Sequence, residues 1–358
     1  MKKKSISRSP VWDLYRDGIS YSMLCKYRNC KERFRLSAVE GLRPSERRAA
    51  MDFGTVFHKA LELTASGKTT TQVINTVIKL YKDTSVDQML VREACVLVPH
   101  YIAINKNSNI KYIAQERVFD IPYKSVTTGK IIRLRGRRDE EFIRNKKLWL
   151  QENKTKTTID ENKIIMTLPH DLQTMLYIYS MTHDYPDKPI GGVLYNVIRR
   201  PSTKQSAKET ELQYLQRLSA TVAKDPEHFF KRYEVELVQS DITNFFNQTL
   251  VPLIENVVIW WESIKSNPFN PWVDEQGNVN PHHYRTPFGI FDPMTLGVGD
   301  YFELTTTGRE LGLVRVETVF PELQGEQGSV SKLDFSSGAL WEAKKSADKA
   351  KKKSVKNN

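Results

Sequence analysis

A change of hydrophobic periodicity near residue 110 is the feature that most constrains the fold of this chain. Before it, apolar residues recur at helical spacing over residues 46–65 and 70–105. After it, branched and aromatic residues indicate strands over 112–119, 130–136 and 147–152, a helix over 169–183 and a fourth strand over 191–198. Helices on both sides of several strands predict an α/β (α+β) protein with a central mixed β-sheet flanked by helices.

The flanking segments extend this core. A short helix is expected over 19–36, with Arg28, Arg33 and Arg35 exposed. Further helices are expected over 208–224 and 240–265, an ordered loop over 267–300 and a strand over 311–320. Because no repeat and no glycine- or proline-rich linker divides the chain, we predict one domain over 1–325, with its core at about 50–200, and a basic tail over 326–358.

The charge of the chain points to an anionic partner. Its 358 residues include 54 Lys and Arg against 42 Asp and Glu, a net charge of +12. Residues 344–358 hold seven lysines and one aspartate, so this segment carries +6, half of the total. We expect the tail to be disordered, and it fits either a solubilising tail or a nucleic-acid arm. The remaining excess has the sign that a phosphate backbone attracts.

The cysteine content and the hydropathy of the chain restrict the cellular compartment that it suits. Three cysteines in a chain of this length exclude a secreted disulfide scaffold. No run approaches the roughly 18 apolar residues that a membrane span needs, and no apolar stretch follows the basic start. The sequence therefore predicts a soluble protein of a reducing compartment such as the cytoplasm, without a membrane partner.

Two acidic residues and a lysine fall beside a predicted turn at 144–146. Asp139 follows Gly136 at the end of one strand, and Glu152 and Lys154 end the next strand at a spacing of two, which places both on one face. A hairpin would bring Asp139 close to Glu152. Carboxylates that hold Mg²⁺ beside a lysine suit phosphodiester hydrolysis. An exposed Glu152–Lys154 ion pair is the alternative, since such pairs are common.

Two helices carry further candidates. Gly54 and His58 share a helix face, and the small residue one turn from the histidine would let this helix approach the sheet closely. Gln173 and Tyr177 share a face of the helix that follows Lys154. Taken singly, His58 could be an ordinary core or surface histidine, and the other pair could be ordinary helix residues.

The order of these residues resembles the RecB/AddB-like branch of the PD-(D/E)XK nuclease superfamily, which includes CRISPR-adaptation nucleases and phage-type exonucleases. The resemblance spans roughly residues 19–300 and is weakest after 200. Its motifs are G-x-x-x-H at Gly54–His58, G-x-x-D at Gly136–Asp139, E-x-K at Glu152–Lys154 and Q-x-x-x-Y at Gln173–Tyr177. It implies a restriction-endonuclease-like core with helical N-terminal and C-terminal additions. It also implies that the protein works in the cytoplasm of a bacterium or of a phage-infected host.

The resemblance also implies roles for these residues. Mg²⁺ or Mn²⁺ would be bound by Asp139, Glu152 and the backbone carbonyl of Asn153, with His58 completing or bordering the metal site. Lys154 would act on the attacking water or the phosphate, and Gln173 and Tyr177 would position the strand and the lysine.

Many members of this branch hold an iron–sulfur cluster, with one cysteine in the N-terminal helix and three near the C-terminus. Cys30 stands at the first place, but the late segment NPHHYRTPFGIFDPM has no cysteine. Four thiolates are the usual requirement, so we expect no cluster. The late loop would then be held by packing, for which Tyr284, Phe288 and Phe291 are candidates. Zinc held by His282, His283 and Cys30 would lack a fourth ligand.

Basic residues near these motifs are candidates for DNA contacts. They are Arg137, Arg138, Arg199, Arg200 and Lys204. The sequence and the resemblance thus predict a metal-dependent deoxyribonuclease. The leading hypothesis is an exonuclease of recombination, repair or replication. Its expected partners are DNA and a recombination or replication protein. The alternatives are an endonuclease or flap-type nuclease on the same site, and a DNA-binding subunit with a degenerate site.

Overall fold

The computed structural model describes residues 9–45, 49–106, 108, 110–274, 276–285, 299–317 and 320, without the side chains of residues 49–52. The chain forms two compact units built from alternating segments. Unit 1 comprises the described residues of 1–46, 118–136 and 243–327, and unit 2 comprises the described residues of 47–117 and 137–242. Two long strands, β3 (Lys111–Lys124) and β4 (Ile131–Arg144), each continue from one unit into the other.

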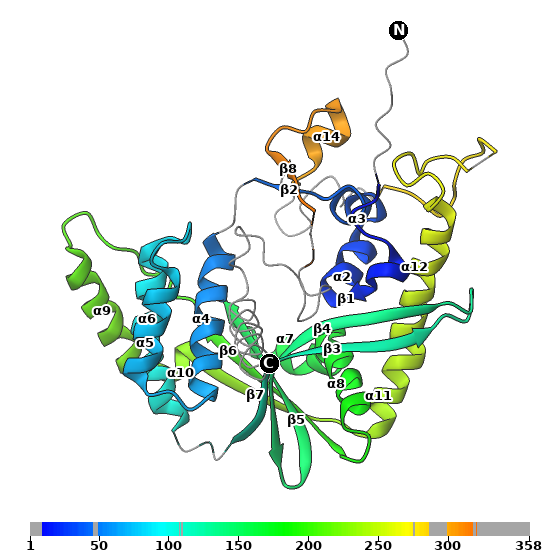
Figure 1. Ribbon diagram of the computed structural model, residues 1–358. Coiled ribbons are helices and arrows are strands. Elements are labelled where there is room, and N and C mark those ends of the chain that lie inside the picture. Colours follow the sequence, from blue (N-terminus) through cyan, green and yellow to red (C-terminus); the bar gives the residue numbers. More distant parts are fainter. Residues whose placement is uncertain are drawn as a thin grey trace, which may run out of the picture. The chain divides into compact units, whose positions relative to one another are not determined.

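Figure 1 labels the elements along the chain. The remaining strands are β1 (Ile19–Ser20), β2 (Leu42–Pro44), β5 (Lys147–Lys156), β6 (Ile190–Arg199), β7 (Phe230–Glu236) and β8 (Leu313–Arg315). The helices up to β6 are α1 (Leu14–Asp17), α2 (Tyr21–Asn29), α3 (Lys31–Ala38), α4 (Ala49–Ala65), α5 (Thr70–Tyr81), α6 (Gln88–Asn105), α7 (Glu161–Thr167), the 3₁₀-helix η1 (Leu168–His170) and α8 (Leu172–Asp184). After β6 they are α9 (Glu211–Lys224), α10 (Pro226–Phe229), α11 (Gln239–Phe245), the π-helix η2 (Phe246–Leu250), α12 (Val251–Ile264) and α14 (Phe302–Thr307).

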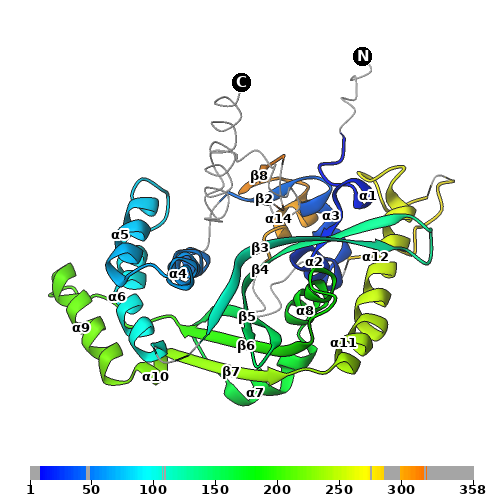
Figure 2. The ribbon, with the colours of Figure 1, turned by 60° about the horizontal axis from the view of Figure 1, so that its bottom comes forward.

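Unit 2 contains a mixed sheet. The second half of β4 pairs antiparallel with β5, β5 pairs parallel with β6, and β6 pairs antiparallel with β7. Figures 1 and 2 show β5, β6 and β7 lying side by side. β6 is buried along nearly its whole length, as expected for a strand covered on both faces. The predicted mixed sheet flanked by helices is therefore confirmed.

Helices α4, α5, α6 and α9 bury one continuous apolar core of unit 2. Its members include Phe53, Val77, Leu97 and Tyr214. Gly54 explains how closely α4 approaches the sheet, because a Cβ atom there would lie 2.9 Å from the Thr155 Oγ1 of β5. The close approach that the sequence predicted for this helix is thus present.

Unit 1 packs α2, α3 and α12 around aromatic rings. Trp12 meets Phe34 and Trp261 edge to face, with ring centroids 5.3 and 5.1 Å apart. The short strand β1 pairs parallel with the first half of β4. Gly18 before it has a φ of 77°, and a Cβ atom there would lie 2.2 Å from the Arg133 carbonyl oxygen, so only glycine fits this close approach.

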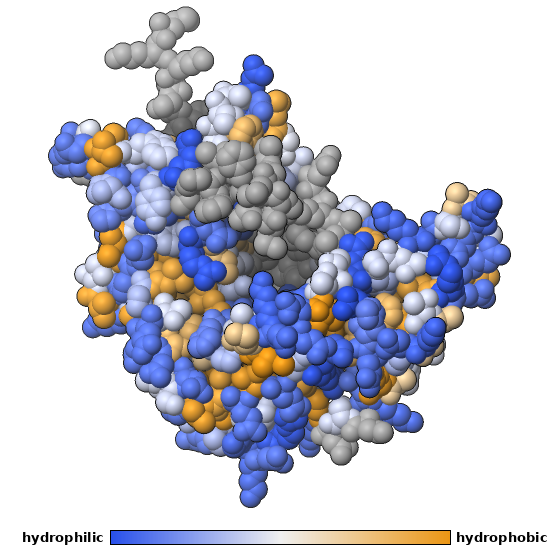
Figure 3. Space-filling view, turned by 180° about the vertical axis from the view of Figure 1, so that it is seen from behind, coloured by the Kyte–Doolittle hydropathy of each residue, from blue (hydrophilic) through white to orange (hydrophobic). Residues whose placement is uncertain are grey.

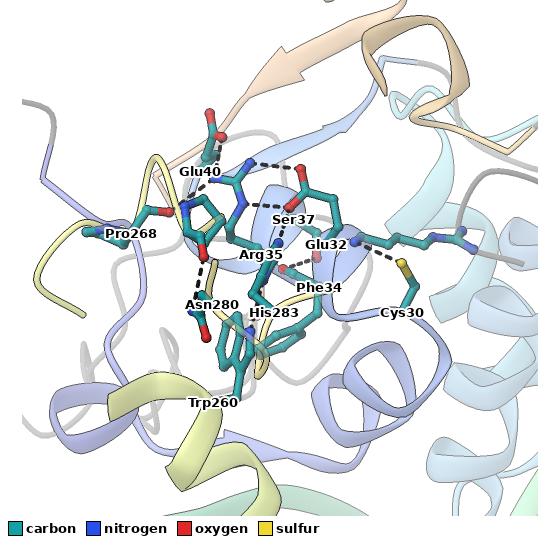
Figure 4. A network of polar contacts seen from close by, with 12 residues as sticks. Cys30, Glu32, Phe34, Arg35, Ser37, Glu40, Trp260, Pro268, Asn280 and His283 are labelled. Carbon is teal, nitrogen blue, oxygen red and sulfur yellow. Dashed lines mark hydrogen bonds and ion pairs between the residues drawn. The ribbon is translucent and has the colours of Figure 1, made fainter. Parts of the chain in front are cut away.

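The helix expected over 19–36 is wrong in one respect, because the chain breaks at Cys30 into α2 and α3. Cys30 is the N-cap of α3 and accepts a hydrogen bond from the Arg33 backbone N–H. Arg35 was expected at the surface but is buried. It forms ion pairs with Glu32 at 2.7 Å and Glu40 at 2.6 Å, since a buried guanidinium is stable only when its N–H groups are paired. Figure 4 shows this network.

His283 joins the late segment to the same network (Figure 4). Its Nδ1 accepts a hydrogen bond from the Trp260 Nε1–H at 3.1 Å, which leaves Nε2 as the donor to Glu32 at 3.0 Å. Both ring nitrogens are therefore engaged within the protein, which removes His283 from the zinc site considered above. The late segment packs through His283, and the half-exposed Tyr284 ring contacts the Lys31 ammonium of α3, 4.7 Å from the ring centroid. Phe288 and Phe291 lie outside the described residues.

Other boundaries differ from the sequence predictions. The helix expected over 70–105 is two helices, α5 and α6, and β4 runs past Asp139 to Arg144, so Asp139 lies within a strand. The strand expected over 311–320 is only β8. The tail over 326–358 lies outside the described residues.

None of the helices among the described residues is long and apolar enough to cross a membrane. On the face in Figure 3, hydrophilic side chains alternate with apolar ones.

Candidate active site

The β4–β5 hairpin sets the register of the site. Asn145 and Lys146 have φ angles of 52° and 64°, the left-handed pair that a two-residue type I′ turn requires. From this turn, Arg144 pairs with Lys147 and, four residues on, Glu140 pairs with Gln151. The next positions on the two strands are Asp139 and Glu152. The hairpin therefore brings these two acids close together, and the Asp139 charge adds to the raised pKa of the Glu152 carboxyl.

Asp139 lies between helix α4 and strand β5. One of its oxygens, Oδ2, accepts a hydrogen bond from the Asn153 backbone N–H at 2.8 Å. The same oxygen lies 3.8 Å from the Nδ1 of His58. His58 stands one turn after Gly54 on α4, so the close helix approach at Gly54 carries the imidazole to Asp139 within strand β4.

Lys154 connects strand β5 with helix α8. Its Nζ lies 2.5 Å from the Glu152 Oε1 and donates a hydrogen bond to the Gln173 Oε1 at 2.7 Å. The Gln173 side-chain amide then donates to the Tyr177 hydroxyl at 3.3 Å. Asp171 caps α8 by accepting from the Thr174 backbone N–H. The two motifs that the sequence placed on a strand and a helix thus form one hydrogen-bonded chain.

Burial governs the protonation of these groups. Burial raises the pKa of the Glu152 carboxyl above its ordinary value, although the Lys154 charge partly opposes the shift. Burial would lower the pKa of Lys154, but the negative charges of Glu152 and Asp139 outweigh it, so the ammonium remains protonated. Burial also lowers the pKa of His58, which keeps the imidazole neutral at neutral pH with a lone pair available.

Glu152 carries an unsatisfied oxygen. The residue is 1% exposed, and its Oε2 is buried without a hydrogen-bond partner among the described residues. A buried carboxylate oxygen of this kind is costly unless a cation or donor meets it. No three His, Cys, Asp or Glu side chains of the described residues are arranged to hold a metal ion by themselves. The donors here are two carboxylates, a neutral imidazole and a backbone carbonyl, a set that suits Mg²⁺ or Mn²⁺ with water completing the shell.

A buried polar network fixes the Asn153 side chain. Its amide N–H₂ donates to Glu140, and its Oδ1 accepts from Gln151 at 3.1 Å and from Asn196 at 2.7 Å. Asn196 donates in turn to the Tyr101 hydroxyl at 3.0 Å. Because the side chain is held at three points, the backbone carbonyl of Asn153 has little freedom to turn.

The five basic residues proposed for DNA contacts have different surroundings. Arg138 is fully buried, where it pairs with Glu141 and Asp184 and donates to Ser180 at 2.7 Å. This placement does not fit the predicted DNA contact, because the guanidinium is buried between β4 and α8 and bound to their side chains. Arg199 is partly exposed and donates to the backbone carbonyls of Thr157 and His228. Arg137 and Arg200 are partly exposed and Lys204 is exposed.

Glu116 and Glu140 were not among the predicted residues. Glu116 on β3 pairs with Arg137 at 2.6 Å, and burial raises the pKa of both acids, with the Asp139 charge adding to the shift. For Glu116, the polar run Gln115-Glu116-Arg117 was a signal, because it interrupts the apolar alternation of a predicted strand. Glu140 gave no such signal, because its partners Gln151 and Asn153 lie across the hairpin on β5, and the residue pattern of its own strand does not mark it as buried.

Comparison with known families agrees with this geometry. A model of the PD-(D/E)XK nuclease superfamily matches residues 18–255, well over half of the chain. The chain belongs to this superfamily, and membership implies a nuclease, a hydrolase with DNA as its substrate. A search of curated proteins found no match. Among 18 matching chains of solved structures is one titled "Crystal structure of SSO0001", 15% identical over 53% of this chain and 71% of that chain, with a TM-score of 0.26. A likeness of this degree carries no structural argument.

Proposed function

We propose that this protein is a Mg²⁺- or Mn²⁺-dependent DNA exonuclease of the RecB/AddB-like type. The observation that carries the proposal is the buried Oε2 of Glu152, which has no hydrogen-bond partner among the described residues and belongs to a carboxylate close to Asp139 and to the ammonium of Lys154. Asp139, Glu152 and the Asn153 carbonyl would hold the cation, with His58 at its border. A cation there would lower the pKa of a water and neutralise charge on the phosphate.

The residues of the chain contribute the positioning. Lys154 stays protonated, so it acts as a hydrogen-bond donor to the water or to a phosphate oxygen, and not as a general base. Glu152 and Gln173 hold its ammonium from two sides. Tyr177, one turn later on α8, restrains Gln173 by accepting a hydrogen bond from its side-chain amide. Partly exposed Arg137, Arg199 and Arg200 and exposed Lys204 supply positive charge for the DNA backbone.

The test is digestion of end-labelled linear, circular and single-stranded DNA with Mg²⁺ or Mn²⁺. We expect the wild type to degrade linear DNA and to spare circles. Asp139→Ala should lower the rate by more than about 100-fold, because loss of a ligand exceeds the effect of losing its outer partners, while DNA binding persists. Glu234→Gln is the matched control, since Glu234 is an exposed acid on β7 of the same unit.

The other outcomes identify the alternatives. Cleavage of circular DNA that depends on Asp139 would replace the exonuclease by an endonuclease, and trimming restricted to flaps would indicate a flap-type enzyme. A wild type that binds DNA but cleaves none with either cation would leave a DNA-binding subunit. A role in recombination, repair or replication, and a protein that loads the enzyme, belong to the same proposal and are tested by capture of partners together with DNA ends.

A further inference from the structure

The ion pair between Glu116 and Arg137 lies outside the four sequence motifs that define the site. Arg137 precedes Asp139 by two residues on β4, and its Nε lies 2.6 Å from the Glu116 Oε2 of β3. The two side chains are 30% and 16% exposed. For neither does the structure record another hydrogen bond or ion pair within the part of the chain that it describes. One edge of the guanidinium is therefore held, and its remaining N–H groups are not engaged there.

The backbone of β3 is distorted at Glu116. Its φ angle is 49°, in the left-handed region that residues other than glycine, asparagine and aspartate rarely adopt. Before it, the half-buried Tyr112 and Ala114 are even-numbered, and after it the buried Phe119, Ile121 and Tyr123 are odd-numbered. A change of phase by one residue is the mark of a β-bulge, which redirects side chains and is frequent beside active sites. At this point of the strand the Glu116 carboxylate lies against the Arg137 guanidinium.

The surroundings of the pair belong to the candidate active site. Burial raises the pKa of Glu116, the Arg137 charge opposes that shift and the Asp139 charge adds to it. Lys59 and Glu62 of α4, which pair with each other at 2.7 Å, also act on this carboxyl. The Arg137 charge in turn contributes to lowering the pKa of His58. The pair thus lies within electrostatic range of the site, Glu116 of Asp139 and Arg137 of His58.

We propose that Glu116 is a positioning residue of this site, which holds Arg137 so that its free N–H groups bind a DNA phosphate next to the bond that is cleaved. The inference rests on the proposed function and adds a residue that the motifs do not contain. An arginine fixed on one edge has lost most of its rotamer freedom before DNA arrives, so it binds a phosphate at a lower entropic cost. Its planar fork offers two parallel N–H groups to phosphate oxygens.

Neutral variants of the pair separate positioning from charge. In Glu116→Gln the shape is kept but Arg137 is released, so we expect kcat to fall about 10- to 100-fold. DNA affinity should stay equal or rise, because a negative charge has been removed from a site for an anion. Arg137→Gln should lower both kcat and DNA affinity. The double variant should be no slower than Arg137→Gln alone, since Glu116 acts through Arg137.

Two further variants test whether a loss of kcat comes from the release of Arg137. Glu116→Asn removes the charge with a residue that tolerates the left-handed backbone, so it should reproduce the loss even if the Gln variant folds poorly. Glu234→Gln removes the partner of Arg144, an exposed pair at 2.7 Å at the other end of β4, and should leave kcat unchanged.

The outcomes that overturn the inference are distinct from those that overturn the function. Unchanged kcat in both Glu116 variants of an active enzyme, or losses that multiply in the double variant, would refute the positioning role and leave the nuclease intact. A fall in DNA affinity of Glu116→Gln without a fall in kcat would refute it as well. A wild type that cleaves no DNA would remove both proposals together.

Discussion

Lys154 illustrates how single residues acquire their roles in this protein. Alone on a strand it would be an ordinary surface lysine, and pairing with a glutamate two residues away is usually worth little. Here Glu152 is almost fully buried and Gln173 approaches from α8, so the ammonium has two fixed acceptors. The negative charges keep it protonated, which makes it a donor toward water or phosphate.

Gln173→Ala tests the anchoring of this lysine. The variant removes the acceptor at 2.7 Å but none of the proposed metal ligands, so we expect kcat to fall about tenfold while the affinity for Mn²⁺ is unchanged. Steady-state cleavage and Mn²⁺ titration measure the two quantities. Gln216→Ala, an exposed glutamine of α9, is the control. A loss of Mn²⁺ affinity in Gln173→Ala would assign Gln173 to the metal instead.

The sequence predicted which neighbouring residues of the site lie together, but not the contacts between residues far apart in the chain. Residue spacing shows which side chains share a face of one strand or helix. Glu152 and Lys154 share a face of β5, and Gln173 and Tyr177 share a face of α8. The structure joins each pair by a hydrogen bond. Arg138 was misjudged because its burial depends on Asp184, 46 residues away. Glu140 was missed for another reason: its partners are nearby on β5, but a buried acid is recognised only once the two strands are paired.

Helix α12 shows how one element organises unit 1. Glu255 accepts hydrogen bonds from the Tyr123 and Ser125 side chains and from two backbone N–H groups of the turn between β3 and β4. Glu262, two turns on, accepts from the Tyr15 hydroxyl at 2.6 Å and pairs with Lys130 at 3.2 Å. A sequence predicts a helix here from apolar spacing, but only the fold shows that its acids bind a strand turn.

Glu262→Gln gives a pH-dependent test of this arrangement. Burial alone would raise the pKa of Glu262, but hydrogen bonds from Lys265, Tyr15 and Lys130 lower it to about 2. Because the folded-state pKa is depressed, the stabilisation is present above the ordinary value of about 4.5 and is lost as the pH falls toward 2. We expect the variant to lose about 1 kcal/mol of unfolding free energy at pH 7.

Urea unfolding between pH 7 and pH 2.5 measures this difference. The gap between wild type and Glu262→Gln should narrow as the pH falls below about 4.5. Glu310→Gln, which alters an acid that is 43% exposed, should show a smaller gap. A gap for Glu262→Gln that is constant over this pH range would contradict the ionic origin of the stabilisation.

At the scale of the whole molecule, the order of helices and strands along the chain was predictable from the sequence. Their distribution over two units, each built from separate segments, was not. The change of period near residue 110 located the strands, and the superfamily match over 18–255 agrees with them. The division into two units, each assembled from separated segments, follows from long-range pairing that no local pattern encodes. The break at Cys30 is a smaller case, because a side-chain cap and a buried ion pair outweigh a continuous helical pattern.

The central claim concerns one divalent cation between Asp139 and Glu152, and calorimetric titration of the intact chain with Mn²⁺ tests it most directly. The account predicts binding in the wild type, the same binding in Glu234→Gln, and a loss of affinity of at least about 100-fold in Glu152→Ala. Equal Mn²⁺ affinity in the wild type and in Glu152→Ala, with both proteins folded, would contradict it.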